Sequence, residues 1–158
     1  MKKIVIEIKW GILFTIMMLA WMYLEKILGW HDRHIDIHPY LTLFFIFPAV
    51  LIYVLALRDK KKNYYGGKMT WLQGFLSGAL IGFIVAVLSP LTQYLILEVI
   101  SPEYLSNAIS QAVEIGSKTK IQAENYFTLR NYIIQGIISA LALGAITGGI
   151  VSVFIRKK

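Results

Sequence analysis

Residues 69–97, MTWLQGFLSGALIGFIVAVLSPLTQYLIL, decide the fold class because they contain no charged side chain. A membrane-spanning α-helix needs about 20 predominantly apolar residues to cross a hydrocarbon core of about 30 Å. Residues 131–155 also lack charge over a sufficient length, and residues 39–57 are uncharged and near the minimum length. A soluble domain would interleave such residues with charge at a period of two or about 3.6. The sequence therefore predicts membrane helices.

The first span is the weakest, since its strictly uncharged stretch covers only residues 10–24. It reaches spanning length if Glu25 and Lys26 extend to the membrane interface. A cleaved signal peptide would need small residues after the apolar run, whereas residues 21–24 are WMYL. We therefore expect a retained helix, and a single domain over residues 1–158. The four predicted spans cover residues 10–30, 39–57, 70–97 and 131–155.

The charge pattern gives an orientation. The net charge is +7, but the basic residues flank the apolar blocks, so a nucleic-acid partner is not expected and the lipid bilayer is. With the N-terminus inside, the inner segments hold 11 of the 16 basic residues and two of the nine acidic ones. These basic residues are Lys2, Lys3, Lys9, Arg58, Lys60, Lys61, Lys62, Lys68, Arg156, Lys157 and Lys158. Both termini are predicted to be cytoplasmic.

The segment between the last two spans, residues 98–130, carries helix signals of its own. SPE at residues 101–103 has a capping hydroxyl, a proline for the first helical position and an acid for the first turn. An amphipathic helix is predicted over about residues 102–115, ending at Gly116, and TKIQ at residues 119–122 resembles a second start. The helix has little net charge, so packing on protein is favoured over binding anionic lipid.

Two ladders of small residues mark the third and fourth spans. A spacing of four keeps small side chains on one helical face and lets two helix backbones approach closely. Packing within one subunit is the main interpretation, and an oligomer interface is the alternative. The ladders are Gly74, Gly78, Gly82 and Ala86 in the third span, and Gly136, Ala140, Gly144, Gly148 and Ser152 in the fourth.

A polar break interrupts the third span at Ser89, Pro90, Thr92 and Gln93. Proline removes a backbone hydrogen bond and leaves a carbonyl that needs another partner in a bilayer. The main interpretation is that nearby hydroxyl and amide groups form hydrogen bonds with that carbonyl. The alternative is that these polar residues line a path for a solute. Pro48 in the second span lacks polar neighbours and predicts only a kink.

The first loop contains His31, His34 and His38, which would share one face of a helix and could bind zinc or copper. Pro39 argues against a continuous helix there, and Arg33 would repel a cation. A solvated loop that anchors the chain at the interface is therefore favoured over a metal site.

Glu25 is the one acid inside a predicted span, and ionisable residues in membranes are functional candidates. Its neighbour Lys26 and its place near the membrane boundary favour an interfacial residue. Arg130 and Glu98 flank the ends of their spans, and Arg130 could pair with Glu25.

No catalytic motif emerges. A phosphate-binding glycine loop, a serine elbow and the paired-histidine helix of metalloproteases are absent from the sequence, and it contains no cysteine. No cofactor is expected. The leading prediction is a non-enzymatic membrane component that assembles with itself or with a membrane-protein partner, and the alternative is a small solute or ion carrier or a channel subunit.

Three stretches carry a family resemblance: IYVLALRDKK at residues 52–61, GKMTWLQGF at residues 67–75 and ISPEY at residues 100–104, followed by the basic terminus IRKK at residues 155–158. With these the chain resembles the family catalogued as domain of unknown function 4199 (DUF4199). The resemblance implies a small four-helix protein of the bacterial inner membrane, with a long segment between its last two helices. It implies no activity, and the histidines of the first loop are not part of it.

Overall fold

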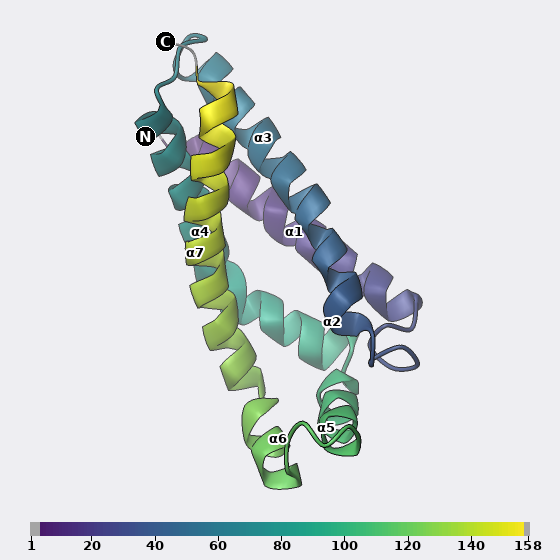
Figure 1. Ribbon diagram of the computed structural model, residues 1–158. Helices are drawn as coiled ribbons and strands as arrows, with labels where there is room; N and C mark the ends of the chain where they lie inside the picture. The colour runs from purple at the N-terminus through teal and green to yellow at the C-terminus, as the bar shows by residue number, and fades with distance from the viewer. Residues whose placement is uncertain (1–3, 157–158) are drawn as a thin grey trace.

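The computed structural model describes residues 4–156, and every regular element within them is helical. The long helices form an elongated bundle (Figure 1). Both chain ends lie at one end of it, here called the terminal end, and the short helices α5 and α6 lie at the other, here called the α5 end. The elements are α1 (Val5–Ile27), α2 (His38–Leu41), the 3₁₀-helix η1 (Thr42–Phe45), α3 (Ile46–Asn63), α4 (Trp71–Tyr94), the π-helix η2 (Leu95–Ile100), α5 (Tyr104–Glu114), α6 (Lys120–Tyr126) and α7 (Leu129–Ile155).

Four helical stretches are long and apolar enough to cross a membrane, which confirms the predicted all-α class with four membrane helices. They are Val5–Ile27, His38–Asn63, Trp71–Ile100 and Leu129–Ile155. The chain is therefore a multi-pass membrane protein by the length and composition of its helices. Four terminal lysines that contribute to the predicted orientation lie outside the described residues; they are Lys2, Lys3, Lys157 and Lys158.

The first span is displaced from its predicted bounds of residues 10–30. It begins at Val5, because the carboxylate of Glu7 is buried against other helices and does not need to reach water. It ends at Ile27, because Gly29 adopts a left-handed conformation with φ +75°. The Trp30 N–H then donates to the carbonyl of Glu25 at 3.0 Å, a typical helix-ending bond.

The second span is longer than its predicted range of residues 39–57. Helix α3 runs on to Asn63, since its lysines are good helix formers and can extend out of an apolar environment. Pro48 lies in the first turn of α3, directly after the 3₁₀-helix η1. Proline cannot donate to a carbonyl in the preceding turn, so it marks a change of helix type at the start of α3 and not a kink in its middle.

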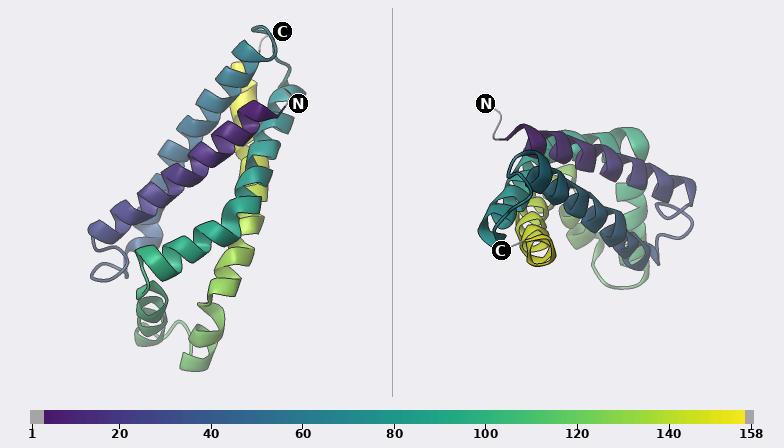
Figure 2. Two further views of the ribbon diagram at one scale, coloured as in Figure 1. Left: turned by 180° about the vertical axis from the view of Figure 1, so that it is seen from behind. Right: turned by 90° about the horizontal axis from the view of Figure 1, so that it is seen from above.

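Helices α4 and α7 form the central pair of the bundle and run side by side (Figure 2). A Cβ atom built on Gly82 would lie 2.6 Å from the carbonyl oxygen of Ala140, and one on Gly144 would lie 2.6 Å from the Cα of Gly82. A Cβ atom on Gly148 would lie 2.7 Å from the Cα of Gly78. The two helix backbones are thus in direct contact, which only glycine permits at these positions.

The same contact continues in both directions along the pair. At the terminal end, a Cβ atom on Gly74 would overlap the side chain of Ser152. Toward the α5 end, a Cβ atom on Gly136 would overlap the hydroxyl of Ser89. The structure therefore brings the two predicted ladders together within one chain.

We predict that Gly78→Ala destabilises the protein by about 1–3 kcal/mol, because the new methyl group meets helix backbone and forces α4 and α7 apart. Thermal unfolding in mild detergent, followed by circular dichroism, measures the loss. Gly149→Ala is the matched control, since its Cβ would have its nearest contact at 3.5 Å, on the ring of Phe75. Equal losses at the two positions would contradict the close contact.

The residues of the polar break in the third span differ in their burial and in their contacts. Ser89 and Thr92 are buried, whereas Pro90 is exposed and Gln93 is half-buried. The Thr92 hydroxyl donates to the carbonyl of Leu88 at 2.8 Å. Beyond this point the helical stretch turns away from α7 toward the turn between α1 and α2 (Figure 1), a bend that a proline inside a helix explains. A solute path along these residues remains a prediction.

A buried ion pair ties three helices together near the terminal end. The carboxylate of Glu7 on α1 lies 2.9 Å from the ammonium of Lys60 on α3 and accepts a 2.7 Å hydrogen bond from Ser77 on α4. All three residues are at most 4% exposed. The ammonium of Lys60 also lies 4.0 Å from the ring centroid of Tyr64. Since a lone charge is costly inside a membrane bundle, this pairing allows both charges to lie within it.

We predict that Glu7→Ala destabilises the protein by roughly 3–5 kcal/mol, because it leaves the buried ammonium of Lys60 without its carboxylate. The double variant Glu7→Leu/Lys60→Met, which removes both charges, should recover most of the loss. Unfolding by dodecyl sulfate monitors both.

The control is Glu124→Ala, which breaks the exposed pair of Lys120 and Glu124, 3.9 Å apart. It should change stability by less than about 1 kcal/mol. A Glu7→Ala protein as stable as this control would contradict the role given to the buried pair.

Candidate metal centre

Helix α5 packs across the α5 end of the bundle, as the predicted amphipathic helix should. Its bounds are narrower than the predicted residues 102–115, because Ser101 does not cap it. The Ser101 side chain is buried and contacts His31 instead, so a tertiary partner replaces the predicted local one. Gly116, at φ +68°, follows the helix, and the capping box of Thr119 begins α6 as predicted.

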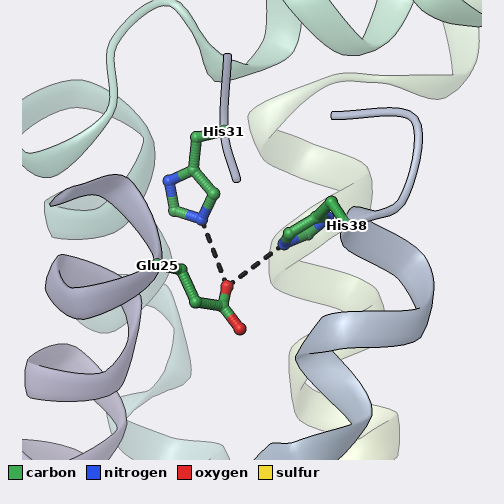
Figure 3. Close-up of side chains that lie close together, drawn as sticks. All are labelled: Glu25, His31 and His38. Atoms are coloured by element: carbon green, nitrogen blue, oxygen red, sulfur yellow. Dashed lines mark hydrogen bonds and ion pairs between the residues drawn. The ribbon is translucent and has the colours of Figure 1, made fainter. Parts of the chain in front are cut away.

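Glu25 is the centre of a buried polar cluster at this end. Its side chain is fully buried, and one carboxylate oxygen lies 3.2 Å from Nε2 of His31 and 3.1 Å from Nε2 of His38 (Figure 3). The other oxygen accepts a 2.5 Å hydrogen bond from the indole of Trp21. Two imidazole nitrogens therefore converge on one carboxylate oxygen.

Local backbone geometry brings these three residues together. Glu25 lies in the last turn of α1, and the left-handed Gly29 reverses the chain directly after that helix. The turn returns His31 toward Glu25, and the N–H of His34 donates to the carbonyl of Gly29 at 2.9 Å to hold it. His38 is the first residue of α2, whose start is favoured by a proline in its first turn.

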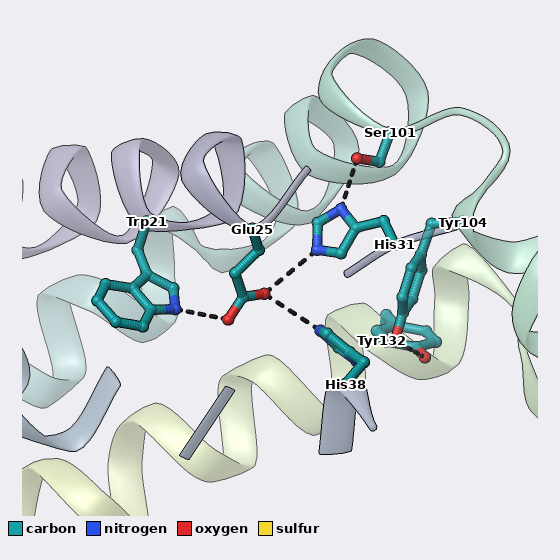
Figure 4. A network of polar contacts seen from close by, with 7 residues as sticks. All are labelled: Trp21, Glu25, His31, His38, Ser101, Tyr104 and Tyr132. Carbon is teal, nitrogen blue, oxygen red and sulfur yellow. Dashed lines mark hydrogen bonds and ion pairs between the residues drawn. The ribbon is translucent and has the colours of Figure 1, made fainter. Parts of the chain in front are cut away.

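A second layer of residues holds the histidines in place (Figure 4). Nδ1 of His31 lies 2.7 Å from the hydroxyl of Ser101, and the Asn107 amide donates to the carbonyl of His31 at 3.0 Å. The Tyr104 ring packs edge-on against both imidazoles, with centroids 5.1 and 5.4 Å away. Burial raises the pKa of the Tyr104 phenol, whose oxygen lies 3.3 Å from that of Tyr132.

Several sequence expectations about this region need correction. Glu25 does not lie at an exposed interface, because its carboxylate finds its partners inside the protein, among them Trp21, His31 and His38. Among the described residues Arg130 is not one of them, and its side chain is exposed. The solvated loop predicted for the three histidines holds only for His34, which is exposed, whereas His31 is 4% exposed.

The cluster has the donor set and spacing of a transition-metal site. One atom from each of Glu25, His31 and His38 lies within 4.8 Å of the others. Metal–ligand bonds of about 2.0–2.2 Å place neighbouring ligand atoms about 3–3.5 Å apart, which agrees with the two nitrogen–oxygen distances here. The contact of His31 Nδ1 with Ser101 leaves Nε2 directed at Glu25, and metal-ligating imidazoles in proteins are oriented by a hydrogen bond of this kind at their other ring nitrogen.

The fold and this cluster together define an all-helical, multi-pass membrane protein with a buried carboxylate–imidazole centre at one end of its bundle. The chain belongs to the family described as "Protein of unknown function (DUF4199)", whose model matches residues 9–157. No curated protein and no solved structure matched the chain. Membership in the family agrees with the resemblance found in the sequence.

Proposed function

We propose that this protein binds a divalent transition-metal ion of the Zn²⁺ class at Glu25, His31 and His38. The observation that carries the proposal is the convergence of two imidazole nitrogens on a single oxygen of a fully buried carboxylate. Imidazole and carboxylate are ligands that zinc and related metals share in proteins. Because a carboxylate with two neutral imidazoles carries a net negative charge, the cluster attracts a cation.

The number of protein ligands bears on the role of the ion. Structural zinc sites are closed by four protein ligands, whereas sites with three keep one position open. The cluster offers three ligands, so a bound ion would keep a position for water or another small ligand. We infer a site that takes up and releases its ion, within a non-enzymatic component of the bacterial inner membrane whose termini face the cytoplasm.

Two further roles follow from the sequence and remain proposals. Assembly with a second copy or with another membrane protein would need a face other than the glycine ladders, because Gly82 and Gly144 already face each other within the chain. A carrier of solutes or ions is supported by the polar break of α4, where the side chains of Ser89 and Thr92 are buried. If the carried solute is the metal, the α5 end would be its entry or exit site.

We predict that the protein purified in mild detergent binds one Zn²⁺ per chain, and that His31→Ala or His38→Ala weakens binding by at least about 100-fold. Loss of a direct ligand should exceed the 10–100-fold cost of losing an outer-shell partner. Equilibrium dialysis measures the affinity. Binding should also weaken as the pH is lowered, since imidazole must be deprotonated to bind a metal.

His34→Ala is the matched control for this experiment, because His34 lies in the same turn but is exposed and outside the cluster. It should bind zinc like the unmodified protein. Equal weakening in all three histidine variants, or no stoichiometric binding in the unmodified protein, would refute the metal site and leave a hydrogen-bonded cluster.

We predict that Ser101→Ala lowers zinc affinity by about 10–100-fold without abolishing binding, because His31 loses the partner that orients its ring. Ser106→Ala is the control, since the Ser106 hydroxyl bonds only to the carbonyl of Glu103 on the exposed side of α5. Equilibrium dialysis measures the zinc affinity of both variants. Equal affinities would show that the contact of Ser101 does not help His31 to bind the metal.

A further inference from the structure

A second site, unrelated to the metal centre, lies at the terminal end of the bundle. A pocket of about 300 Å³ opens between the last turns of α3 and α7 and the loop that follows α3. Its lining consists of Arg58, Lys61, Lys62, Gly67, Phe154 and Ile155. Three of these six residues are cationic, and none is acidic.

Within the described residues, two of the pocket's three cations lack partners, whereas the third, Lys61, and the nearby Lys9 have them. Lys9 pairs with Asp59, and Lys61 donates to the carbonyl of Ile155 at 2.5 Å. Within residues 4–156, by contrast, the side chains of Arg58 and Lys62 form no hydrogen bond or ion pair, and both are exposed. An arginine fork and an ammonium beside it provide donors for the oxygens of a phosphate group.

The position of the pocket specifies what else the ligand carries. The candidate spans His38–Asn63 and Leu129–Ile155 both end beside it, so it lies where the apolar part of the bundle meets water. Phe154 on its rim is 83% exposed, and Ile150, one turn further into the span, is 57% exposed. A ligand seated here would place an anionic group on the cations and an apolar chain along α7.

We propose that this basic pocket binds the phosphate headgroup of an anionic phospholipid, with its acyl chains lying along α7 beside Phe154. Basic pockets between membrane helices at the cytoplasmic surface are typical sites for anionic headgroups. The predicted orientation places this end in the cytoplasm. The proposal is independent of the metal centre, which lies at the opposite end of the bundle.

Native mass spectrometry of the full chain, incubated with phosphatidylglycerol or phosphatidylcholine in mild detergent, tests the proposal. We expect phosphatidylglycerol to be retained preferentially. Arg58→Gln/Lys62→Gln should reduce that retention roughly 30-fold, since each cation near an anionic surface contributes about a factor of five. Lys118→Gln/Lys120→Gln is the control, because it removes the same net charge at the α5 end and should retain the lipid.

The remaining outcomes are equally decisive. Inorganic phosphate that displaces phosphatidylglycerol at millimolar concentration would identify a site for a soluble anion and overturn the lipid proposal. Equal loss in both double variants would show attraction by net charge alone, and equal retention of the two lipids by the unmodified protein would show no headgroup site. Circular dichroism reports whether each variant is folded, and the single variant Arg58→Gln takes the place of the double variant if the double variant does not fold.

Discussion

The direct contact between the backbones of α4 and α7 is the constraint on which the rest of the bundle depends. Apolar side chains gain nothing from leaving lipid for a helix interface, so membrane helices associate through close backbone packing and polar contacts. The close backbone packing is supplied by four glycines, Gly78, Gly82, Gly144 and Gly148. Because this contact fixes the central pair, α1 and α3 can be held against it by an apolar cluster around Leu57 and Ile81 and by polar contacts near their ends.

Helix α1 shows how those polar contacts work. It carries a buried carboxylate near each end, Glu7 and Glu25, and the partners of each come from other elements. Glu7 faces a lysine, so that pair is neutral and serves to join helices. Glu25 faces two imidazoles, whose charge depends on their protonation. The same helix therefore carries a buried ion pair at one end and the carboxylate–imidazole cluster, our proposed metal site, at the other.

The sequence predicts what depends on local patterns. Long uncharged runs gave the four spans, and the cap at Thr119 begins its helix as expected, because a capping box involves residues only three positions apart. His31 and His38 could be named from the sequence as weak metal candidates, but their meeting with Glu25 could not be predicted, since the three residues come from a turn, α2 and α1 and are supported by the segment that leads into α5. Ser101 illustrates the reason: its local pattern indicates a cap, but the tertiary contact with His31 prevails.

The contact between Ser101 and His31 also explains how one cluster can be stable with and without an ion. Without a cation, a neutral His31 with its proton on Nε2 can donate to Glu25, and its Nδ1 can then accept from the serine hydroxyl. A metal needs the Nε2 lone pair, so the ring must carry its proton on Nδ1, and the serine oxygen must then accept. A hydroxyl can do both, whereas a carbonyl or an ammonium in its place would favour one tautomer. Serine is therefore suited to a site that both binds its ion and releases it.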